Sequence, residues 1–340
     1  MPELKVGLIG FGLAGSVFHA PLIASEPRFE LAAVATSRTL PAEFARAETV
    51  ADPLALIADP AIDLVVIASP NASHAPLARA ALMAGKHVVV DKPFTIDVRE
   101  ADALIDLARL KERHLSVFQN RRWDGNFLTV RQLLDEGAIG EVRYCEIHYD
   151  RFRPELKAGW RETLIPGAGT LYNLGPHLLD QALCLFGKPR SVLADIAIQR
   201  EGAEVDDYVH IVLDYGRLRV VLHASTLVPK EGPRLIAHGK SESLYQFGMD
   251  PQEPQLAAGL RPGQPGWGEA EDVSVVVGAG ESERTMPVRP GAYECFYRAV
   301  AASILDGAPP PVTLDDAHTL MTMIEAARRS AVEGRKIALA

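Results

Sequence analysis

A lysine directly after an apolar run is the first residue suited to proton transfer. Lys92 stands between Asp91 and Pro93, and the run at residues 87–90 predicts a buried strand. Partial burial near another positive charge lowers the pKa of a lysine, which can then polarise or deprotonate a hydroxyl. The alternative is a surface lysine before a turn proline, and the tripeptide alone leaves both interpretations open.

A histidine in a glycine-rich stretch, residues 167–180, is the second such residue. Pro176 suits the first turn of a helix, on which His177 and Asp180 are three residues apart and share a face. Asn173 lies at or before the helix start and can also face His177. A histidine held between an amide and a carboxylate has a fixed tautomer, which suits a group that shuttles the proton of an alcohol. Taken alone, the pattern favours the alternative of an N-cap asparagine and a histidine in the core.

Aromatic and basic residues form a third group, at positions 120–123, 149–153 and 160–161. Arginine and tyrosine side chains donate hydrogen bonds to hydroxyl groups, so this group could line a pocket for a hydroxyl-rich ligand. The alternative for residues 149–153 is an exposed strand face. The residues expected to contact such a substrate are Arg122, Tyr149, Arg151, Trp160, Asn173 and His177.

A glycine motif at the N-terminus predicts what lies next to these groups. The stretch that starts at Lys5 holds an apolar run, residues 6–9, that ends in G-x-G-x-x-G, with glycines at positions 10, 12 and 15. Gly10 suits the tight turn, Gly12 allows a pyrophosphate to approach the backbone, and Gly15 allows the following helix to pack closely. The motif on its own is weak, but its place between a strand and a helix predicts a dinucleotide site rather than a structural turn.

The second apolar run, residues 29–35, indicates which dinucleotide is preferred. It ends in Thr36-Ser37-Arg38, where a fold specific for NAD places a carboxylate for the ribose 2′-hydroxyl. A hydroxyl and a guanidinium instead suit a 2′-phosphate. We therefore expect NADP as the cofactor, with NAD possible; the alternative is a solvated loop arginine.

Strands alternate with helices through the first third of the chain. Strands are expected at 63–70, 87–90 and 115–119, and helices from 16 to about 27, from just after the loop 71–74 to about 84, and at 98–112. This alternation predicts an α/β, doubly wound parallel sheet of the Rossmann type, whose ligands bind at the carboxyl ends of the strands. The residues expected to bind the cofactor are Gly10, Phe11, Gly12, Leu13, Ala14, Gly15, Ser37, Arg38, Ser69, Pro70, Asn71, His74, Asp91, Lys92 and Asn120.

The character of the chain changes near residue 122. A helix at 126–136 leads into expected strands at 141–152, 191–199, 208–214, 217–226 and 235–238, the middle three joined by short turns. Residues 251–271 indicate an irregular loop, followed by helices at 293–305 and 314–333. We expect a Rossmann dinucleotide-binding domain at 1–121 and an α+β domain with a largely antiparallel sheet at 122–340 for substrate binding and oligomerisation. The last helix could pack back on the first domain.

Composition excludes several classes of protein. The net charge of −9 argues against nucleic acid or an anionic membrane as partner. The three cysteines, at positions 145, 184 and 295, are scattered without a C-x-x-C pair, which favours a reducing compartment and predicts no metal site. No apolar run approaches a membrane span, and the first strand leaves no room for a signal peptide. We expect a cytoplasmic protein.

Taken together, these motifs resemble the glucose–fructose oxidoreductase/inositol dehydrogenase (Gfo/Idh/MocA) family over nearly the whole chain. The resemblance rests on residues 10–15, 69–74, 91–93, 120–124, 169–180 and 311–313. Within the family, residues 120–124, 149–154, 160–162 and 169–172 are most similar to the NADP-dependent scyllo-inositol 2-dehydrogenases. The resemblance implies a Rossmann domain, an open α+β sheet, and subunits that pair through its exposed face as a homodimer or homotetramer. Lys92 matches the family's catalytic lysine, and His177 its catalytic histidine.

Two positions depart from the family pattern. Asp91 stands where the family usually has glutamate, which is a mild change. Asn173 occupies the position of an active-site aspartate in the pattern D-x-x-x-H. An aspartate would stabilise an imidazolium, whereas a neutral asparagine exchanges only hydrogen bonds; the comparable change in a Ser-His-Asp triad lowers the rate about ten-thousand-fold. Asp180 and Lys92 could take over part of that role.

The resemblance implies an NADP-dependent dehydrogenase that oxidises a CH–OH group of a polyol or sugar, with scyllo-inositol as the leading substrate. Lys92, His177, Asn173 and Asp180 would form the catalytic group. Asn173 motivates the alternative of a non-catalytic NADP- or sugar-sensing protein of the same fold. A third interpretation keeps the enzyme class and changes the substrate to another sugar-like molecule, such as an anhydro-ketose, a dihydrodiol or an aldose.

Overall fold

The computed structural model describes residues 4–157, 159 and 162–339, and the chain forms two compact units. The first unit holds Met1–Asn120, Gln252–Trp267 and Ala292–His318, and the second holds Arg121–Pro251, Gly268–Gly291 and Thr319–Ala340. The chain passes between the units several times, whereas the sequence suggests one crossing after residue 121.

The first unit is built on a parallel sheet. Within the described residues this sheet has six strands in the order β3-β2-β1-β4-β5-β6, the order of a dinucleotide-binding fold. Its strands are β1 (Leu4–Ile9), β2 (Phe29–Ala35), β3 (Glu48–Val50), β4 (Leu64–Ile67), β5 (His87–Val90) and β6 (Leu115–Val117). Every residue of β4 is buried, as a continuous apolar run in a parallel sheet requires. The predicted doubly wound parallel sheet is confirmed.

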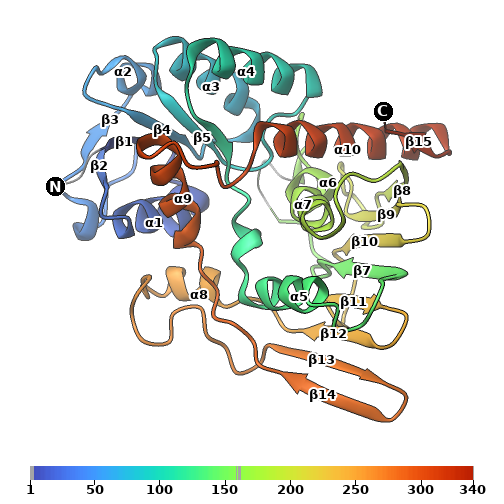
Figure 1. Ribbon diagram of the computed structural model, residues 1–340. Helices are drawn as coiled ribbons and strands as arrows, with labels where there is room; N and C mark the ends of the chain where they lie inside the picture. Colours follow the sequence, from blue (N-terminus) through green and yellow to red (C-terminus); the bar gives the residue numbers. More distant parts are fainter. Residues whose placement is uncertain (1–3, 158, 160–161, 340) are drawn as a thin grey trace. The chain divides into compact units, whose positions relative to one another are not determined.

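Helices cover both faces of this sheet, as Figure 1 shows, with α3 and α4 on one face and α1 and α9 on the other. The helices of the unit are α1 (Ala20–Ser25), α2 (Pro53–Ala58), α3 (His74–Met83), α4 (Val98–Lys111), α8 (Gln252–Ala257) and α9 (Glu294–Leu305). α8 corrects the expectation of an irregular loop over 251–271. Its proline falls in the first turn, where no backbone N–H is needed.

The second unit is built on a mixed sheet. Its nine strands in the described residues run β14-β13-β12-β11-β7-β10-β9-β8-β15. They are β7 (Tyr144–His148), β8 (Ser191–Ala197), β9 (Tyr208–Asp214), β10 (Arg219–Ser225), β11 (Leu235–His238), β12 (Ser243–Phe247), β13 (Ser274–Ala279), β14 (Ser282–Met286) and β15 (Ile337–Ala338). All neighbouring pairs are antiparallel except β7 with β10, which confirms the largely antiparallel sheet.

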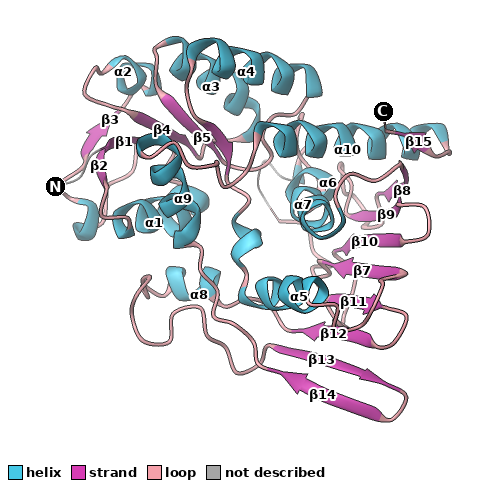
Figure 2. Cartoon of the chain, viewed as in Figure 1, coloured by secondary structure: helices cyan, strands magenta, loops and turns pink. Residues whose placement is uncertain are grey.

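One face of this sheet packs against helices (Figure 2). The helices of the unit are α5 (Gly125–Asp135), α6 (Thr170–Asn173), α7 (Gly175–Phe186) and most of α10 (Leu314–Glu333). Burial alternates along β9, where Val209, Ile211 and Leu213 are buried and the residues between them are half-buried. α7 contacts β7 and β10, and α6 contacts β9. The opposite face, lined by half-buried side chains, is here called the open face.

Two of the strands that the sequence did not reveal lack a clear apolar alternation. β14 is Ser-Glu-Arg-Thr-Met and is mostly exposed at the edge of the sheet. β12 buries Gln246 in place of an apolar residue. β7 is shorter than the expected strand at 141–152. No helix in the described part of the chain is long and apolar enough to cross a membrane.

Candidate active site

The residues expected to bind a cofactor lie at one edge of the parallel sheet. The glycine turn follows β1, residues 37–38 follow β2, residues 69–74 follow β4, residues 91–92 follow β5, and Asn120 follows β6. Because all these strands are parallel, their carboxyl ends share an edge, where nucleotides bind in open α/β sheets.

The turn after β1 has the backbone geometry that a pyrophosphate requires. Gly10 has a φ of +95°, and a Cβ there would lie 2.6 Å from the carbonyl oxygen of Ala68. A Cβ on Gly15 would clash with the carbonyl oxygen of Gly10. Nothing lies within 4 Å of the position that a Cβ of Gly12 would take, so the backbone there is open to a ligand. The three glycines therefore fit a dinucleotide.

A helix leaves this turn in an unusual form. Ala14–His19 is π-helical and continues directly into α1. Both the backbone N–H and the hydroxyl of Ser16 donate to the carbonyl oxygen of Gly12, at 2.9 and 2.8 Å. The helix start places partial positive charge beside the turn. The Phe11 ring is buried edge-on against Phe44, so Phe11 can face a ligand only with its backbone.

The loop after β2 presents a cation to solvent. The side chains of Ser37 and Arg38 are exposed. The backbone N–H of Arg38 donates to the hydroxyl of Thr36 at 3.0 Å, which fixes the loop. An exposed guanidinium on a loop held in this way suits recognition of a phosphate.

A buried histidine ties two of the loops together. The Nδ1 of His74 lies 2.8 Å from the carbonyl oxygen of Pro93, and its Nε2 lies 2.9 Å from that of Ser69. Burial lowers the pKa of His74, so the ring is neutral at pH 7 and donates through one nitrogen at a time. His74 thus holds the loop that carries Lys92 against the loop after β4.

A series of polar side chains, most of them buried, is linked to Lys92 through Asp91. Asp91 accepts a hydrogen bond from the backbone N–H of Lys92 at 2.7 Å, and its carboxylate lies 3.9 Å from Nε2 of His19. The Nδ1 of His19 is 2.6 Å from the hydroxyl of Tyr297 on α9. Burial alone would raise the pKa of Asp91, but His19, Lys92 and His74 together lower it. The Asp91 carboxylate, which directly precedes Lys92 in sequence, is therefore kept in its charged form.

The second unit holds the histidine motif on two consecutive helices. Asn173 is the last residue of α6, and α7 begins two residues later with Pro176 in its first turn. Gly169 has a φ of +89°, and a Cβ there would clash with the carboxylate of Asp206. That carboxylate accepts the backbone N–H of Leu171 at 2.6 Å, which holds the start of α6.

Asp180, one turn along α7 from His177, is bound by an arginine. The Nε and Nη2 atoms of Arg122 donate to its two oxygens at 2.9 and 2.7 Å. The side chains are only 11% and 4% exposed, so this is a buried, bidentate ion pair. The pair brings Arg122 to the helix that carries His177. Orientation of His177 by Asp180 stays a prediction.

Tyr149 packs beside His177 rather than standing free. The two rings are stacked with centroids 6.0 Å apart, and the Tyr149 hydroxyl lies 3.4 Å from Oε1 of Gln181. The guanidinium carbons of Arg121 and Arg234 lie 5.4 and 5.6 Å from the Tyr149 ring centre. Burial raises the pKa of Tyr149, which keeps its hydroxyl protonated.

Two predicted substrate residues remain, Arg151 and Trp160. Arg151 follows β7, and its backbone N–H donates to the carbonyl oxygen of Ser225 at 2.9 Å. Trp160 lies outside the described residues. Sequence reasoning missed His19, Tyr297 and Gln181, because their contacts join residues that are distant in sequence. Arg121 was included only as a member of the basic group at positions 120–123.

The chain is similar to known oxidoreductases over its whole length. The models of the Gfo/Idh/MocA oxidoreductase family match it twice, the NAD-binding Rossmann fold at residues 4–119 and the C-terminal alpha/beta domain at 131–339. It is 45% identical to an uncharacterised oxidoreductase, YdgJ, of Escherichia coli K12, with 99% of each chain covered. It is 40% identical to the scyllo-inositol 2-dehydrogenase (NADP(+)) IolW of Bacillus subtilis 168, covering 99% of this chain and 96% of that one. The structure of the oxidoreductase yvaA from Bacillus subtilis superposes with a TM-score of 0.95 at 40% identity, covering 100% and 99% of the two chains.

Proposed function

The chain belongs to the Gfo/Idh/MocA oxidoreductase family, and from this premise we propose that it oxidises a CH–OH group of a polyol with NADP, scyllo-inositol being the leading substrate. The glycine turn, open at Gly12, carries the proposal because it fits a dinucleotide. The exposed guanidinium of Arg38 supports NADP over NAD. The name of the relative IolW supports the same cofactor and substrate.

The chemistry divides between the cofactor and this chain's residues. When bound, the cofactor accepts the hydride from the alcohol carbon and returns it in the reverse reaction. In the proposal, His177 takes the hydroxyl proton and Lys92 assists by polarising the hydroxyl oxygen. The reverse reaction uses the same groups to protonate the reduced ketone.

The second unit supplies the groups that orient the substrate. Arg122 is fixed by Asp180 through a bidentate ion pair and belongs to the proposed substrate group. Tyr149 limits the motion of the His177 ring by stacking on it. Asn173 acts through hydrogen bonds, without the charge that an aspartate would provide. Arg151 and Trp160 complete the proposed substrate group.

Lys92→Ala tests the proposal. We expect turnover with scyllo-inositol and NADP⁺ to be lost, because the hydroxyl is no longer polarised. The affinity for NADPH, measured by fluorescence titration, should stay within about twofold, since the phosphates are held elsewhere. Lys111→Ala, on α4, is the matched control and should behave like the wild type. Unchanged turnover in Lys92→Ala would remove Lys92 from the mechanism.

Asn173 favours a second candidate, a protein that binds the cofactor or a sugar without catalysis. Asn173→Asp separates the two. We expect a rise in kcat at constant KM for NADP⁺, because the added carboxylate stabilises a protonated His177. Absence of turnover in both the wild type and the variant, with NADPH still bound, would favour the sensor.

A further inference from the structure

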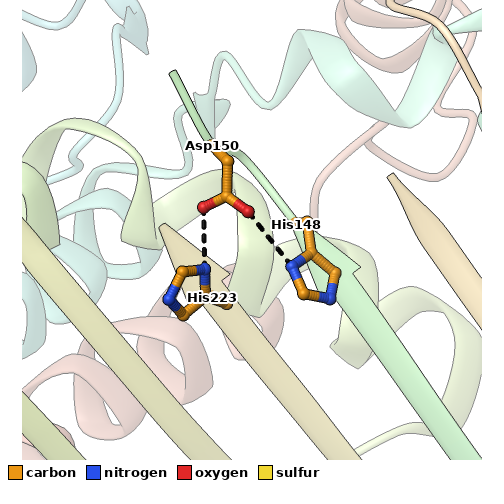
Figure 3. Close-up of side chains that lie close together, drawn as sticks. All are labelled: His148, Asp150 and His223. Atoms are coloured by element: carbon orange, nitrogen blue, oxygen red, sulfur yellow. Dashed lines mark hydrogen bonds and ion pairs between the residues drawn. The ribbon is translucent and has the colours of Figure 1, made fainter. Parts of the chain in front are cut away.

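Two histidines and an aspartate meet on the open face of the second sheet, away from the residues assigned to catalysis. His148 ends β7, Asp150 follows two residues later, and His223 lies on β10. Figure 3 shows both imidazole rings directed at the Asp150 carboxylate. Their ligand atoms all lie within 4.8 Å of one another.

Strand pairing brings these residues together. β7 and β10 are the one parallel pair among the described strands of this sheet, and their register places His148 beside His223. Asp150 follows His148 by two residues, and residues two apart in extended chain share a face. In the single chain the side chains of His148, Asp150 and His223 are 23%, 12% and 18% exposed.

The spacing of the donor atoms suits a small divalent cation. Nδ1 of His223 lies 2.7 Å from Oδ1 of Asp150, and Nδ1 of His148 lies 3.3 Å from Oδ2. Ligands about 2.0–2.1 Å from a tetrahedral ion lie roughly 3.3 Å from each other. Small rotations of the side chains would therefore admit the ion.

A further carboxylate stands where metal sites place a supporting residue. Oε2 of Glu146 lies 2.7 Å from Nε2 of His148, the nitrogen that faces away from Asp150. Glu146 is on the same face of β7, and it also accepts the hydroxyl of Tyr144. A ligand histidine commonly donates its other ring N–H to a carboxylate, which fixes the tautomer and strengthens the metal bond.

We propose that Nδ1 of His148, a carboxylate oxygen of Asp150 and Nδ1 of His223 bind one zinc ion, with water as the fourth ligand. Two imidazoles and one carboxylate are ligands that zinc prefers. The ion would join the end of β7 to β10. Tyr149 lies between two of the ligands in the chain and is buried on the other side of the strand, so bound zinc would also restrain the ring that stacks on His177.

Metal titration of the full-length, tag-free protein tests the proposal. After chelator treatment and dialysis, Zn²⁺ is titrated by calorimetry and Co²⁺ by absorbance. We expect one ion per chain and the intense visible bands of tetrahedral Co²⁺, without the charge-transfer band that a thiolate ligand would give. A wild type that binds no Zn²⁺ at a 1:1 ratio, or gives only octahedral or thiolate Co²⁺ spectra, would overturn the proposal.

Variants locate the ion. His223→Gln and Asp150→Asn should each weaken Zn²⁺ binding by more than about a hundredfold, and Glu146→Gln by about tenfold. His210→Gln is the control, because its ring lies 5.9 Å from that of His223 on the same face but is not one of the three ligands. Equal affinity in the wild type and the two ligand variants would contradict the assignment. If a variant fails to fold, the Co²⁺ spectrum of the wild type and the Glu146→Gln titration still decide.

Discussion

In the proposed function, Arg38 is the residue that selects the cofactor. Its guanidinium is exposed on a loop after β2, where a 2′-phosphate would lie in this fold. We expect Arg38→Ala to raise the Kd for NADPH by at least about tenfold, because a charge-assisted hydrogen bond contributes roughly 1.5–3 kcal/mol. The Kd for NADH should change little. Fluorescence titration with both cofactors measures the effect.

An arginine elsewhere in the unit provides the control for this prediction. Arg79 is exposed on α3, away from the strand ends, so Arg79→Ala should leave both constants unchanged. Equal loss of NADPH and NADH affinity in Arg38→Ala would mean that the residue supports the loop and does not select the phosphate.

Residue types suggest a chemistry for the proposed site, but they do not reveal the contacts within it. Lys92, His177 and Asp180 could be chosen from their motifs, because strand ends and helix spacing follow from sequence. The bidentate partner of Asp180, Arg122, lies 58 residues away, and no periodicity links the two. The proposed zinc ligands show the same limit, since 73 residues separate His223 from Asp150.

At the scale of elements, the pairing of β5 with β6 makes the first unit sensitive to acid. The backbone N–H of His114 donates to Nδ1 of His87 at 3.0 Å, so His87 must be neutral. Burial, with a contribution from Arg113, lowers the pKa of His87 to about 4. In the unfolded chain that pKa is about 6.5. The unfolded state therefore binds the extra proton between these values, and stability falls as the pH falls from 6.5 to 4.

His87→Asn removes this titration and keeps an acceptor at the same position. As the pH falls from 6.5 to 4, the free energy of unfolding of the wild type should decrease, relative to that of the variant, by up to about 1.4 kcal/mol per pH unit. Urea unfolding at several pH values measures the difference. His318→Asn, at a histidine that is 47% exposed, is the control. Parallel pH profiles for the wild type and His87→Asn would contradict the assigned pKa.

Elements with strong local signals were predicted closely. β2, β5 and α10 begin and end where their patterns indicate, because continuous apolar runs and helical periodicity are local properties. Short or polar elements were not predicted, such as β3 and β14, because they are held by neighbouring strands. The π-helical start at Ala14–His19 has no recognised sequence signal.

At the scale of the molecule, we propose that the open face of the second sheet pairs subunits. Strand register places five residues of this face side by side in a row, in the order Val212, Val221, Glu146, Ile236 and Tyr245. All of them except Glu146 are apolar or aromatic. Apolar side chains on a sheet face without a helical cover favour association. Light scattering should give a dimer or tetramer for the wild type.

Val221→Glu places a second carboxylate beside Glu146 in this row, and we expect it to shift the protein to monomers. Leu110→Glu is the control, because Leu110 is 77% exposed on α4 in the first unit. An unchanged oligomer in Val221→Glu, with an unchanged circular dichroism spectrum, would place the subunit contact elsewhere.

The most direct test of the proposed function is the rate of scyllo-inositol oxidation, followed by nicotinamide absorbance with NADP⁺ and separately with NAD⁺. We predict rapid, scyllo-inositol-dependent reduction of NADP⁺, at least about tenfold slower reduction of NAD⁺, and no reduction by Lys92→Ala. Absence of reduction with both cofactors, in protein shown by fluorescence to bind NADPH, would contradict the assignment of scyllo-inositol as substrate.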